Sequence, residues 1–409
     1  MNGTDKTGHE ARPGNLKQYL QDPWLAELMS EIKDAGPMKS SLLDLTHKCN
    51  LRCEGCYYFS QEMDHYQKPA DEAEFDAFVA AEKARGTNML TVVGGEPALE
   101  LGRLRKLAKH FRLTVVTNGS LPIPTEGLEQ IRIAVSFWGD ELRDTLLRGN
   151  GSRNIFQQAL AHFKDDPRVG FYYTTVAGYT EQIEATVERM VENGNFVSFN
   201  FYADLAEKGG AYDHRRGFAE VNRIIRRLSL RFPRQIMSSP YSNQIIDQGH
   251  LFGQPWGYEV CPSLSYDHPK NQARMKTGKH YPTQFRAYYA DLKTTRPCCI
   301  GEARDCATCT DVWASYAWIV GSMKAHLNHE RDFQAWLFTT YIFYASSGFI
   351  DWHHAARRHL PAIYQRFAEW DESDQSSQLM CRQEHASRFD KSMKIFPIMA
   401  VAELEQQYG

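Results

Sequence analysis

Three cysteines in one short segment carry the clearest chemistry in this chain of 409 residues. The segment reads Cys49-Asn-Leu-Arg-Cys53-Glu-Gly-Cys56. Three thiolates on one loop can bind three irons of a cubane cluster, which leaves the fourth iron without a protein ligand. That iron is then open to a small molecule. The alternative for this segment is a zinc site with His47 as the fourth ligand.

A second group of cysteines lies more than 200 positions later. Cys306 and Cys309 are spaced so that both thiolates can reach one metal centre, and Cys261 with the pair Cys298-Cys299 precedes them. Adjacent cysteines point in different directions, so we expect only one of that pair to join a four-thiolate cage. Structural zinc is the alternative here as well.

The elements that position these cysteines follow from six short apolar runs. The runs lie at 42–45, 89–93, 113–116, 131–135, 171–176 and 196–201. Helical segments are expected between them, at about 71–85, 100–111, 124–130, 152–164 and 180–193. Alternating strands and helices predict a parallel sheet with helices outside. Six units are too few for a closed eight-unit barrel, so we predict an α/β fold, a partial (β/α)6 TIM-like barrel.

Unusual residues follow several of these runs at the point where each predicted strand ends. Cys49 follows the first run, Gly94-Gly95-Glu96-Pro97 the second, Asn118-Gly119-Ser120 the third, and Ser136 lies at the end of the fourth. The carboxyl ends of parallel strands meet at one edge, where such folds have their active sites. The sequence therefore predicts one site built from four loops.

The spacing of the first three cysteines, followed by GGEP, TNGS and a strand that enters Ser-Phe-Trp-Gly, strongly resembles the radical S-adenosylmethionine (radical SAM) superfamily over residues 40–205. The resemblance implies that Cys49, Cys53 and Cys56 bind a [4Fe-4S] cluster whose open iron chelates S-adenosylmethionine. It further implies one-electron cleavage to a 5′-deoxyadenosyl radical, chemistry that belongs to the cofactor while the protein positions and shields it.

The same resemblance assigns cofactor contacts. Gly94, Gly95, Glu96 and Pro97 are expected at the methionine amino group, because glycine lets a backbone come close. Asn118 and Ser136 are expected at the ribose or the methionine carboxylate. Arg148 is a candidate partner of that carboxylate, since a guanidinium binds it with two hydrogen bonds. The family has an aromatic residue before its third cysteine where this chain has Gly55, so Tyr57 is the candidate for the adenine.

The second group of cysteines is similar to the C-terminal SPASM or twitch extension of many radical SAM enzymes, although the full seven-cysteine pattern is absent. We expect one auxiliary iron–sulfur cluster, of the [4Fe-4S] type. Its predicted ligands are Cys261, Cys299, Cys306 and Cys309, and the alternative to Cys299 is Cys298. Cys298 or Cys381 is a candidate hydrogen-atom donor, although Cys381 is more typical of an ordinary buried cysteine.

The predicted organisation has four parts. A leader helix lies in residues 1–38, the barrel core in 39–205, a connector with the cysteine-rich extension in 206–310, and a helical tail in 311–409. The arginine-rich stretch after residue 215 is more typical of a solvated helix face than of a binding site. The aromatic stretch 333–352 is too polar and too short to span a bilayer, so it is expected to be a buried helix.

The amino-acid composition limits the kinds of partner that this chain is expected to bind. A formal net charge of −3 argues against nucleic acid, which requires clustered Lys and Arg. The N-terminus has no apolar segment typical of a signal peptide, so we expect a cytoplasmic protein without a membrane partner. A flavodoxin or ferredoxin is the expected reductant.

The expected enzyme removes a hydrogen atom from a small-molecule natural product or a ribosomal peptide, leading to oxidation, bond formation or epimerisation. Asn200 and Tyr202, at the end of the sixth run, are candidate substrate contacts. The alternative function class is a non-catalytic iron–sulfur or zinc-binding scaffold or electron carrier, which has no need of GGEP or TNGS.

Overall fold

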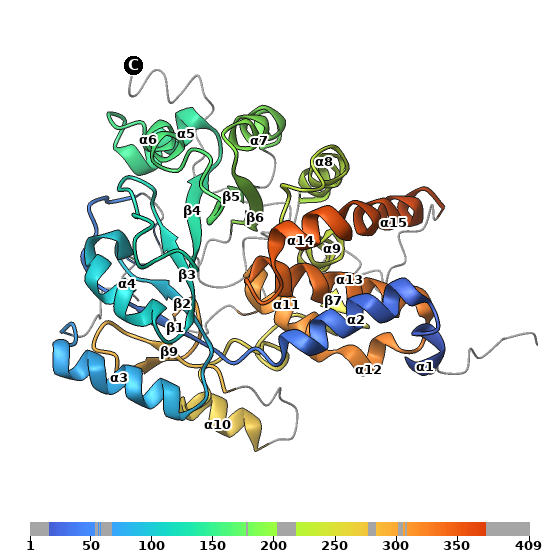
Figure 1. Ribbon diagram of the computed structural model, residues 1–409, viewed down its shortest axis with the longest axis horizontal. Coiled ribbons are helices and arrows are strands. Elements are labelled where there is room, and N and C mark those ends of the chain that lie inside the picture. The colour runs from blue at the N-terminus through green and yellow to red at the C-terminus, as the bar shows by residue number, and fades with distance from the viewer. Residues whose placement is uncertain are drawn as a thin grey trace, which may run out of the picture.

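The computed structural model describes residues 16–53, 56, 58, 68–176, 179–202, 218–276, 284–301, 306 and 309–373. They form an α/β part built on one sheet and a helical body beside it (Figure 1). Tyr57 and Cys381, which the sequence singled out, lie outside the described residues.

Six parallel strands form the α/β part, as the apolar runs predicted. They are β1 (Ser40–Asp44), β2 (Met89–Val93), β3 (Arg112–Thr117), β4 (Arg132–Trp138), β5 (Val169–Thr175) and β6 (Phe196–Phe201). Their order in the sheet follows their order in the chain, and each pairs in parallel with the next. The predicted partial barrel is confirmed.

Two short strands from the cysteine-rich extension lengthen this sheet beyond β1, which the sequence did not predict. β9 (Ala287–Tyr288) pairs in parallel with β1, and β10 (Thr295–Arg296) pairs antiparallel with β9. Two residues are too few for a periodic pattern to be visible in the sequence. Beyond the opposite edge, Val197 of β6 forms a single parallel bridge with Ile236.

Helices cover the outer face of the sheet. They are α3 (Glu72–Ala84), the 3-10 turn η2 (Pro97–Glu100), α4 (Leu101–Ala108), α5 (Glu141–Gly149), α6 (Ile155–His162) and α7 (Ile183–Glu192). Phe137 of β4 packs on Phe156 of α6 with ring centroids 4.4 Å apart. Phe137 therefore faces outward, and its neighbours Ser136 and Trp138 face the inner side of the sheet.

Two expectations about these helices were wrong. Residues 124–130 form turns rather than a helix, because Gly127 has a φ of +72° and the buried side chain of Arg168 binds the carbonyl oxygens of Pro124 (3.0 Å) and Leu128 (3.1 Å). Helix α5 was not predicted. It begins where the Asp140 side chain accepts a hydrogen bond from the Arg143 amide.

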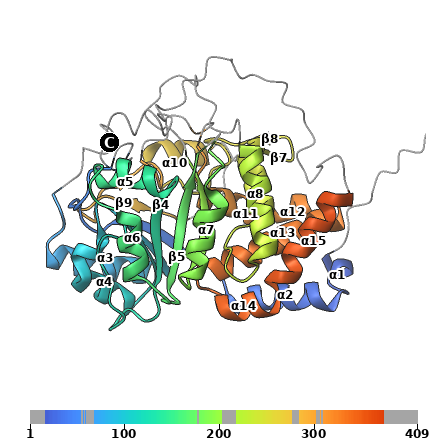
Figure 2. The same ribbon diagram turned by 90° about the horizontal axis from the view of Figure 1, so that it is seen from above.

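The helical body combines the N-terminal helices with those that follow β6. It contains α1 (Leu16–Tyr19), α2 (Pro23–Ala35), α8 (Phe218–Arg231), α9 (Pro240–Gln248), α11 (Val312–Gly321), α12 (Met323–His326), α13 (Glu330–Ser346), α14 (Trp352–Arg358) and α15 (Leu360–Ser373). Helix α2 ends at Gly36 and packs against α13. Figure 2 shows α3, α4 and α6 on the opposite side of β5 from α13.

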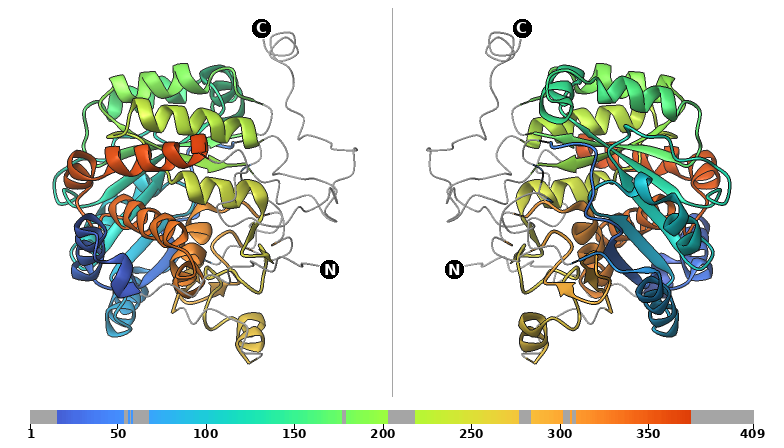
Figure 3. Two further views of the ribbon diagram at one scale, coloured as in Figure 1. Left: turned by 90° about the vertical axis from the view of Figure 1, so that its right-hand side faces the viewer. Right: turned by 90° about the vertical axis from the view of Figure 1, so that its left-hand side faces the viewer.

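Helix α13 lies at the centre of this body. It contacts α2, α9, α11, α12, α14 and α15, and nearly all of its side chains are buried. The orange and red helices of the body lie in front of the strands in the left-hand view of Figure 3 and behind them in the right-hand view. The buried aromatic helix predicted within 333–352 is confirmed. None of the described helices is both long and apolar enough to cross a membrane.

The rest of the cysteine-rich extension contains the hairpin β7 (His250–Leu251) and β8 (Gln254–Pro255) and helix α10 (Pro269–Met275). The arginine-rich face of α8 pairs with α7. Arg227 bonds Glu184 at 2.8 Å and Arg231 bonds Glu188. These side chains are about half exposed, so this face is a solvated contact between helices, as expected.

Candidate functional site

The loop after β1 carries Cys49, Cys53 and Cys56, all half-buried. Burial raises the pKa of the Cys53 thiol to about 11, the Arg148 guanidinium opposes this, and negative charge on Cys56 or Cys49 adds to it. Burial also raises the pKa of Cys49, with Glu96 and Cys56 acting in the same direction. The three thiols are thus close enough to influence one another, as a shared metal group requires.

The two glycines after β2 allow this loop to lie directly on the neighbouring strand end. A Cβ on Gly95 would stand 2.0 Å from the Lys48 carbonyl oxygen, and one on Gly94 would stand 2.4 Å from that of Thr46. The Gly95 amide donates to the Thr46 oxygen and the Glu96 amide to the Lys48 oxygen, both at 2.8 Å. In this structure the two glycines therefore allow their backbone to approach the cysteine loop closely.

Glu96 joins the end of β2 to the end of β3. Its fully buried carboxylate accepts hydrogen bonds from the Thr117 hydroxyl (2.7 Å), the Asn118 amide (2.7 Å) and the Ala98 amide (2.9 Å). Burial raises the pKa of Glu96, although these hydrogen bonds and the charge of Arg148 oppose the shift. Its oxygens hold main-chain and hydroxyl groups, so this side chain fixes the loops after β2 and β3 to each other.

Asn118 is tied to the cysteine loop. Its side-chain nitrogen lies 2.9 Å from the Asn50 side-chain oxygen and 3.8 Å from the Cys49 sulfur. The Asn50 side chain in turn donates to the Ser120 hydroxyl at 2.8 Å. Predicted site residues from two different loops are thus brought together at the first thiol set.

Arg148 lies at the same edge, but its donors are engaged within the protein. One terminal nitrogen binds the Ser136 carbonyl oxygen and the Asp144 carboxylate, each at 2.6 Å, and the other binds the Asn118 carbonyl oxygen at 2.5 Å. The charges of Arg148 and Cys53 also act on each other's pKa, so the guanidinium lies near this thiol. Arg148 therefore binds the backbone of β4 and of the loop after β3. The resemblance had implied a contact with the methionine carboxylate instead.

The inner face of β4, β5 and β6 presents a row of side chains toward the same edge. The strand register aligns Trp138, Thr174 and Asn200. Tyr202 follows β6, and its ring meets the Trp138 ring edge-on at 5.5 Å. Tyr202 therefore lies beside Trp138, and Asn200 lies two strands away from it at the same level of the sheet, near the carboxyl ends of the strands.

The second thiol set is assembled by main-chain pairing between two distant segments. The Cys299 amide donates to the Ser263 carbonyl oxygen (3.2 Å) and the Ser265 amide to that of Pro297 (2.8 Å). Leu264 and Cys298 form an antiparallel bridge. Burial raises the pKa of Cys261 well above its usual value, and negative charge on Cys309, Cys298 or Cys306 acts in the same direction. Four of the predicted thiols are thus neighbours.

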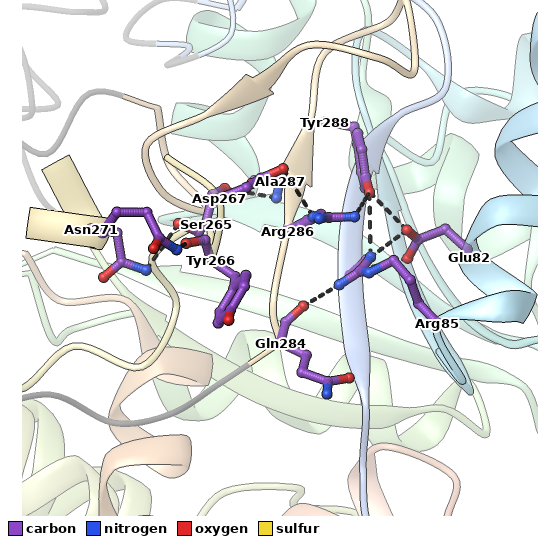
Figure 4. Close-up of polar contacts among 12 residues, drawn as sticks. Glu82, Arg85, Ser265, Tyr266, Asp267, Asn271, Gln284, Arg286, Ala287 and Tyr288 are labelled. Atoms are coloured by element: carbon purple, nitrogen blue, oxygen red, sulfur yellow. Dashed lines mark hydrogen bonds and ion pairs between the residues drawn. The ribbon is translucent and has the colours of Figure 1, made fainter. Parts of the chain in front are cut away.

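Figure 4 shows the polar contacts that dock this segment onto the sheet. The Ser265 hydroxyl donates to the Arg296 carbonyl oxygen at 2.5 Å and accepts from the Ala287 amide at 2.9 Å. On the outer side, the buried carboxylate of Glu82 accepts a hydrogen bond from the Tyr288 hydroxyl at 2.7 Å and pairs with Arg85. The thiol set is therefore fixed to β1 through β9 and β10.

A contact with β6 holds the other end of the extension. The Thr310 hydroxyl donates to the Phe201 carbonyl oxygen at 2.6 Å, and Asp311 caps the start of α11. The second thiol set therefore lies across the open side of the partial barrel, between its first and last strands.

Sequence reasoning missed Asp44 and Arg296, which pair at the inner side of the sheet with 1% and 0% side-chain exposure. A signal was present, since Asp44 is a lone carboxylate in an apolar strand and Arg296 stands two positions before Cys298. Asp144, the partner of Arg148, was missed because α5 was not predicted.

The first three thiols are not all within the spacing that a single tetrahedral zinc ion requires. Thiolates around tetrahedral zinc lie about 3.8 Å apart, given a Zn–S distance of about 2.3 Å. Among the described residues, the three possible ligand atoms found within 4.8 Å of one another belong to Glu31, His354 and His359, and the thiols do not form such a set.

The Glu31 group is itself unsuited to a metal. The Trp24 indole donates to Nδ1 of His359 at 3.1 Å, so the proton of the neutral imidazole is on Nε2. That nitrogen donates to Glu31, 3.2 Å away, and offers no lone pair to an ion. The group connects α2 to the helices after α13.

Comparisons with known proteins match the first thiol set. Residues 36–132 match a family described as a 4Fe-4S single cluster domain. An S-adenosylmethionine-dependent nucleotide dehydratase from Thermoplasmatales archaeon (strain ISO4-H5) is 29% identical over 147 residues, which are 32% of this chain and 51% of that protein. The chain thus spans about half the length of this curated relative.

Solved structures with partial similarity include Streptococcus suis SuiB bound to the precursor peptide SuiA, at 20% identity over 56% of each chain and a TM-score of 0.35. Native anSMEcpe with bound AdoMet is 17% identical over 64% of this chain and 75% of that chain, with a TM-score of 0.44. The FeFe-hydrogenase maturase HydG from Carboxydothermus hydrogenoformans is 13% identical over 77% and 81%, with a TM-score of 0.33. None of these likenesses carries a substrate over to this chain.

Proposed function

We propose that this chain is a radical SAM enzyme, which reductively cleaves S-adenosylmethionine and removes a hydrogen atom from a carbon of its substrate. The observation that carries the proposal is the set of Cys49, Cys53 and Cys56 on one loop, braced by the ends of β2 and β3. When bound, a [4Fe-4S] cluster with one open iron supplies the electron that breaks a carbon–sulfur bond of the sulfonium.

The residues of the chain have separate tasks in this proposal. Cys49, Cys53 and Cys56 hold the cluster. Gly94 and Gly95 let the cysteine loop lie on β2, and Glu96 fixes the end of β3. Arg148 acts as a positioning residue because it holds the Ser136 and Asn118 carbonyl oxygens, and we no longer assign it to the methionine carboxylate.

We assign the contacts with S-adenosylmethionine to side chains and backbone groups that are exposed in the site. The Ser136 side chain lies on the inner face of β4, half-exposed, and Asn118 lies beside Cys49. We assign both to the polar groups of S-adenosylmethionine, together with the backbone of residues 94–97. Tyr57 stays a prediction for the adenine.

We assign the auxiliary cluster to Cys261, Cys298, Cys306 and Cys309, with Cys298 in place of Cys299. Support comes from packing. Cys298 and Cys309 lie against the main core, whereas Cys299 packs with Leu42, Val93 and Ala287 on the inner face of the sheet. The Cys299 thiol therefore lies on the inner face of the sheet and outside the proposed ligand set.

The substrate proposed is a small molecule, and a ribosomal peptide is the competing class. The curated relative is named for a nucleotide substrate, whereas SuiB is described with a peptide. Trp138, Asn200 and Tyr202 are the residues we assign to the substrate, because an aromatic face beside an amide suits a compact ring with polar substituents. A flavodoxin or ferredoxin is the proposed electron donor.

The test is to incubate the anaerobically reconstituted, reduced protein with S-adenosylmethionine and measure 5′-deoxyadenosine by mass spectrometry. The parent should form it, and the Cys49/Cys53/Cys56→Ala variant should not. Cys299→Ala is the matched control, since it removes a thiol outside both proposed ligand sets and should retain both clusters. A parent that holds its iron and sulfide yet forms no 5′-deoxyadenosine would point to a scaffold or electron carrier instead.

Iron and sulfide assays on the triple variant test the auxiliary cluster. That variant should retain about four irons and four sulfides per chain, as one remaining [4Fe-4S] cluster requires. Zinc without sulfide in the triple variant would overturn the auxiliary cluster while leaving the first site intact.

A further inference from the structure

A buried ion pair lies between the segments that carry the two thiol sets. Asp44 is the last residue of β1, and Arg296 is the last of β10. One terminal nitrogen of Arg296 lies 3.0 Å and 2.8 Å from the two oxygens of Asp44. Their side chains are 0% and 1% exposed. Removing two charges from water is costly, so such a pair is weak evidence for a role in stability alone.

Both residues of the pair lie close in sequence to proposed cluster ligands. Asp44 leads into the loop of the first thiol set, since the next residue, Leu45, is still bonded to β2 through the Val93 carbonyl oxygen at 2.9 Å. Arg296 precedes Cys298 by two positions, and Cys298 is bridged to Leu264. The charge of Arg296 acts on the pKa of the Cys298 thiol, so this charge reaches the second thiol set.

The backbone of this region is positioned without the ion pair. β10 pairs with β9, and β9 pairs with β1. The Ser265 hydroxyl also binds the Arg296 carbonyl oxygen and the Ala287 amide. The carboxylate and the guanidinium therefore add two opposite charges to a segment whose main chain is already held in place by strand pairing and by Ser265.

We propose that Asp44 and Arg296 set the reduction potential of the auxiliary cluster, with Arg296 as the cation that favours its reduced state and Asp44 as the anion that limits this effect. The inference rests on the proposed function. A cluster that accepts one electron gains one negative charge, so a nearby cation raises its potential and a nearby anion lowers it. Buried charges are little screened by salt.

Two substitutions should shift the potential in opposite directions. Asp44→Asn keeps the shape and leaves Arg296 uncompensated, so the auxiliary cluster should become easier to reduce. Arg296→Gln removes the cation and should make it harder to reduce. Arg296→Lys keeps the charge and should stay closer to the parent than Arg296→Gln does. If the two substitutions only disturbed the fold of this segment, the reduction potential would not be expected to shift in opposite directions.

The experiment is an anaerobic redox titration followed by electron paramagnetic resonance, on the full-length holoprotein and on the Cys49/Cys53/Cys56→Ala variant that keeps the auxiliary cluster alone. Adding S-adenosylmethionine to the holoprotein identifies the signal of the first cluster, because only that signal should change. Arg286→Gln is the matched control, since it breaks an ion pair with Asp267 (3.0 Å) in the same segment but nearer the surface. It should leave the potential unchanged.

Shifts of opposite sign for Asp44→Asn and Arg296→Gln support the inference. An unchanged potential in Asp44→Asn, or shifts of the same sign in both variants, overturn it while the proposed function stands. If Asp44→Asn loses its cluster, the comparison of Arg296→Lys with Arg296→Gln decides, and equal potentials in these two overturn the inference. If the triple variant holds no sulfide, the auxiliary cluster does not exist, and this inference fails together with that assignment. An unchanged potential in a protein that holds the cluster overturns the inference alone, so the two failures can be distinguished.

Discussion

Both parts of the molecule bury polar side chains, but at the carboxyl edge of the sheet these side chains bind loop backbone, whereas in the helical body they join one helix to another. Glu96 and Arg148 hold amides and carbonyl oxygens of the loops around the first thiol set. In the helical body, His326 receives a hydrogen bond from Tyr241 at 3.0 Å and sits among aromatic rings. The difference predicts that changes at the sheet edge alter metal binding, and that changes in the helical body alter stability.

The largest expected effect comes from Gly95→Ala. The added Cβ would meet the Lys48 carbonyl oxygen at 2.0 Å, which is backbone and cannot move aside without displacing Cys49. We expect loss of the first cluster, measured as iron and sulfide per folded chain after reconstitution and as 5′-deoxyadenosine formed. Gly102→Ala is the control, because a Cβ there has no neighbour within 4 Å. Normal loading of Gly95→Ala would show that the loop does not depend on this approach.

Phe338→Ala tests the other half of the comparison. Phe338 is fully buried in α13 and contacts the rings of Trp24, Phe367 and Trp370. Loss of this ring should lower the free energy of unfolding by about 3–5 kcal/mol, measured by chemical denaturation. Iron and sulfide per folded chain should match the parent. A loss of the first cluster without a loss of stability would contradict the division between the two parts.

The pH dependence of stability tests the buried histidine. Burial lowers the pKa of His326 to about 4, although its hydrogen bond to the Ser322 carbonyl oxygen opposes the shift. The unfolded-state pKa is about 6.5, so the unfolded chain takes up this proton first as the pH falls. Stability is therefore full above about pH 6.5 and should fall between pH 6.5 and 4, by about 3 kcal/mol in total.

His326→Gln should remove that part of the pH dependence, seen as a flatter profile of melting temperature against pH. His110→Gln, at an exposed position, should keep the slope of the parent. Equal slopes in the parent and in His326→Gln would show that this imidazole does not titrate with folding.

The smallest effect is expected on the solvated contact between α7 and α8. Arg227 and Glu184 are 60% and 45% exposed. Exposed ion pairs contribute less than about 1 kcal/mol, so Arg227→Gln should change the free energy of unfolding by no more than that, and less at high salt. A loss as large as that of Phe338→Ala would mean that surface charge, and not only aromatic packing, holds the helical body together.

The site could be predicted from the sequence only as far as spacing and periodicity reach. The three cysteines, the glycines after β2 and the six strands are local patterns, and each was recognised. The turn at 124–130 was not, because its conformation depends on Arg168, a side chain from the next βα unit. Our proposal of Cys298 in place of Cys299 has the same origin, since adjacent cysteines look alike until the faces of a short segment are known.

The sequence by itself determined the strands, the two cysteine groups whose spacing indicates metal binding, and the edge of the sheet at which the first group lies, because these follow from residue type and short spacing. Only the tertiary structure decided that Arg148 binds carbonyl oxygens, that Asp44 meets Arg296, and that the second thiol set spans the gap between β1 and β6. Those relations join residues 30 to more than 250 positions apart, and no local pattern encodes a contact of that kind.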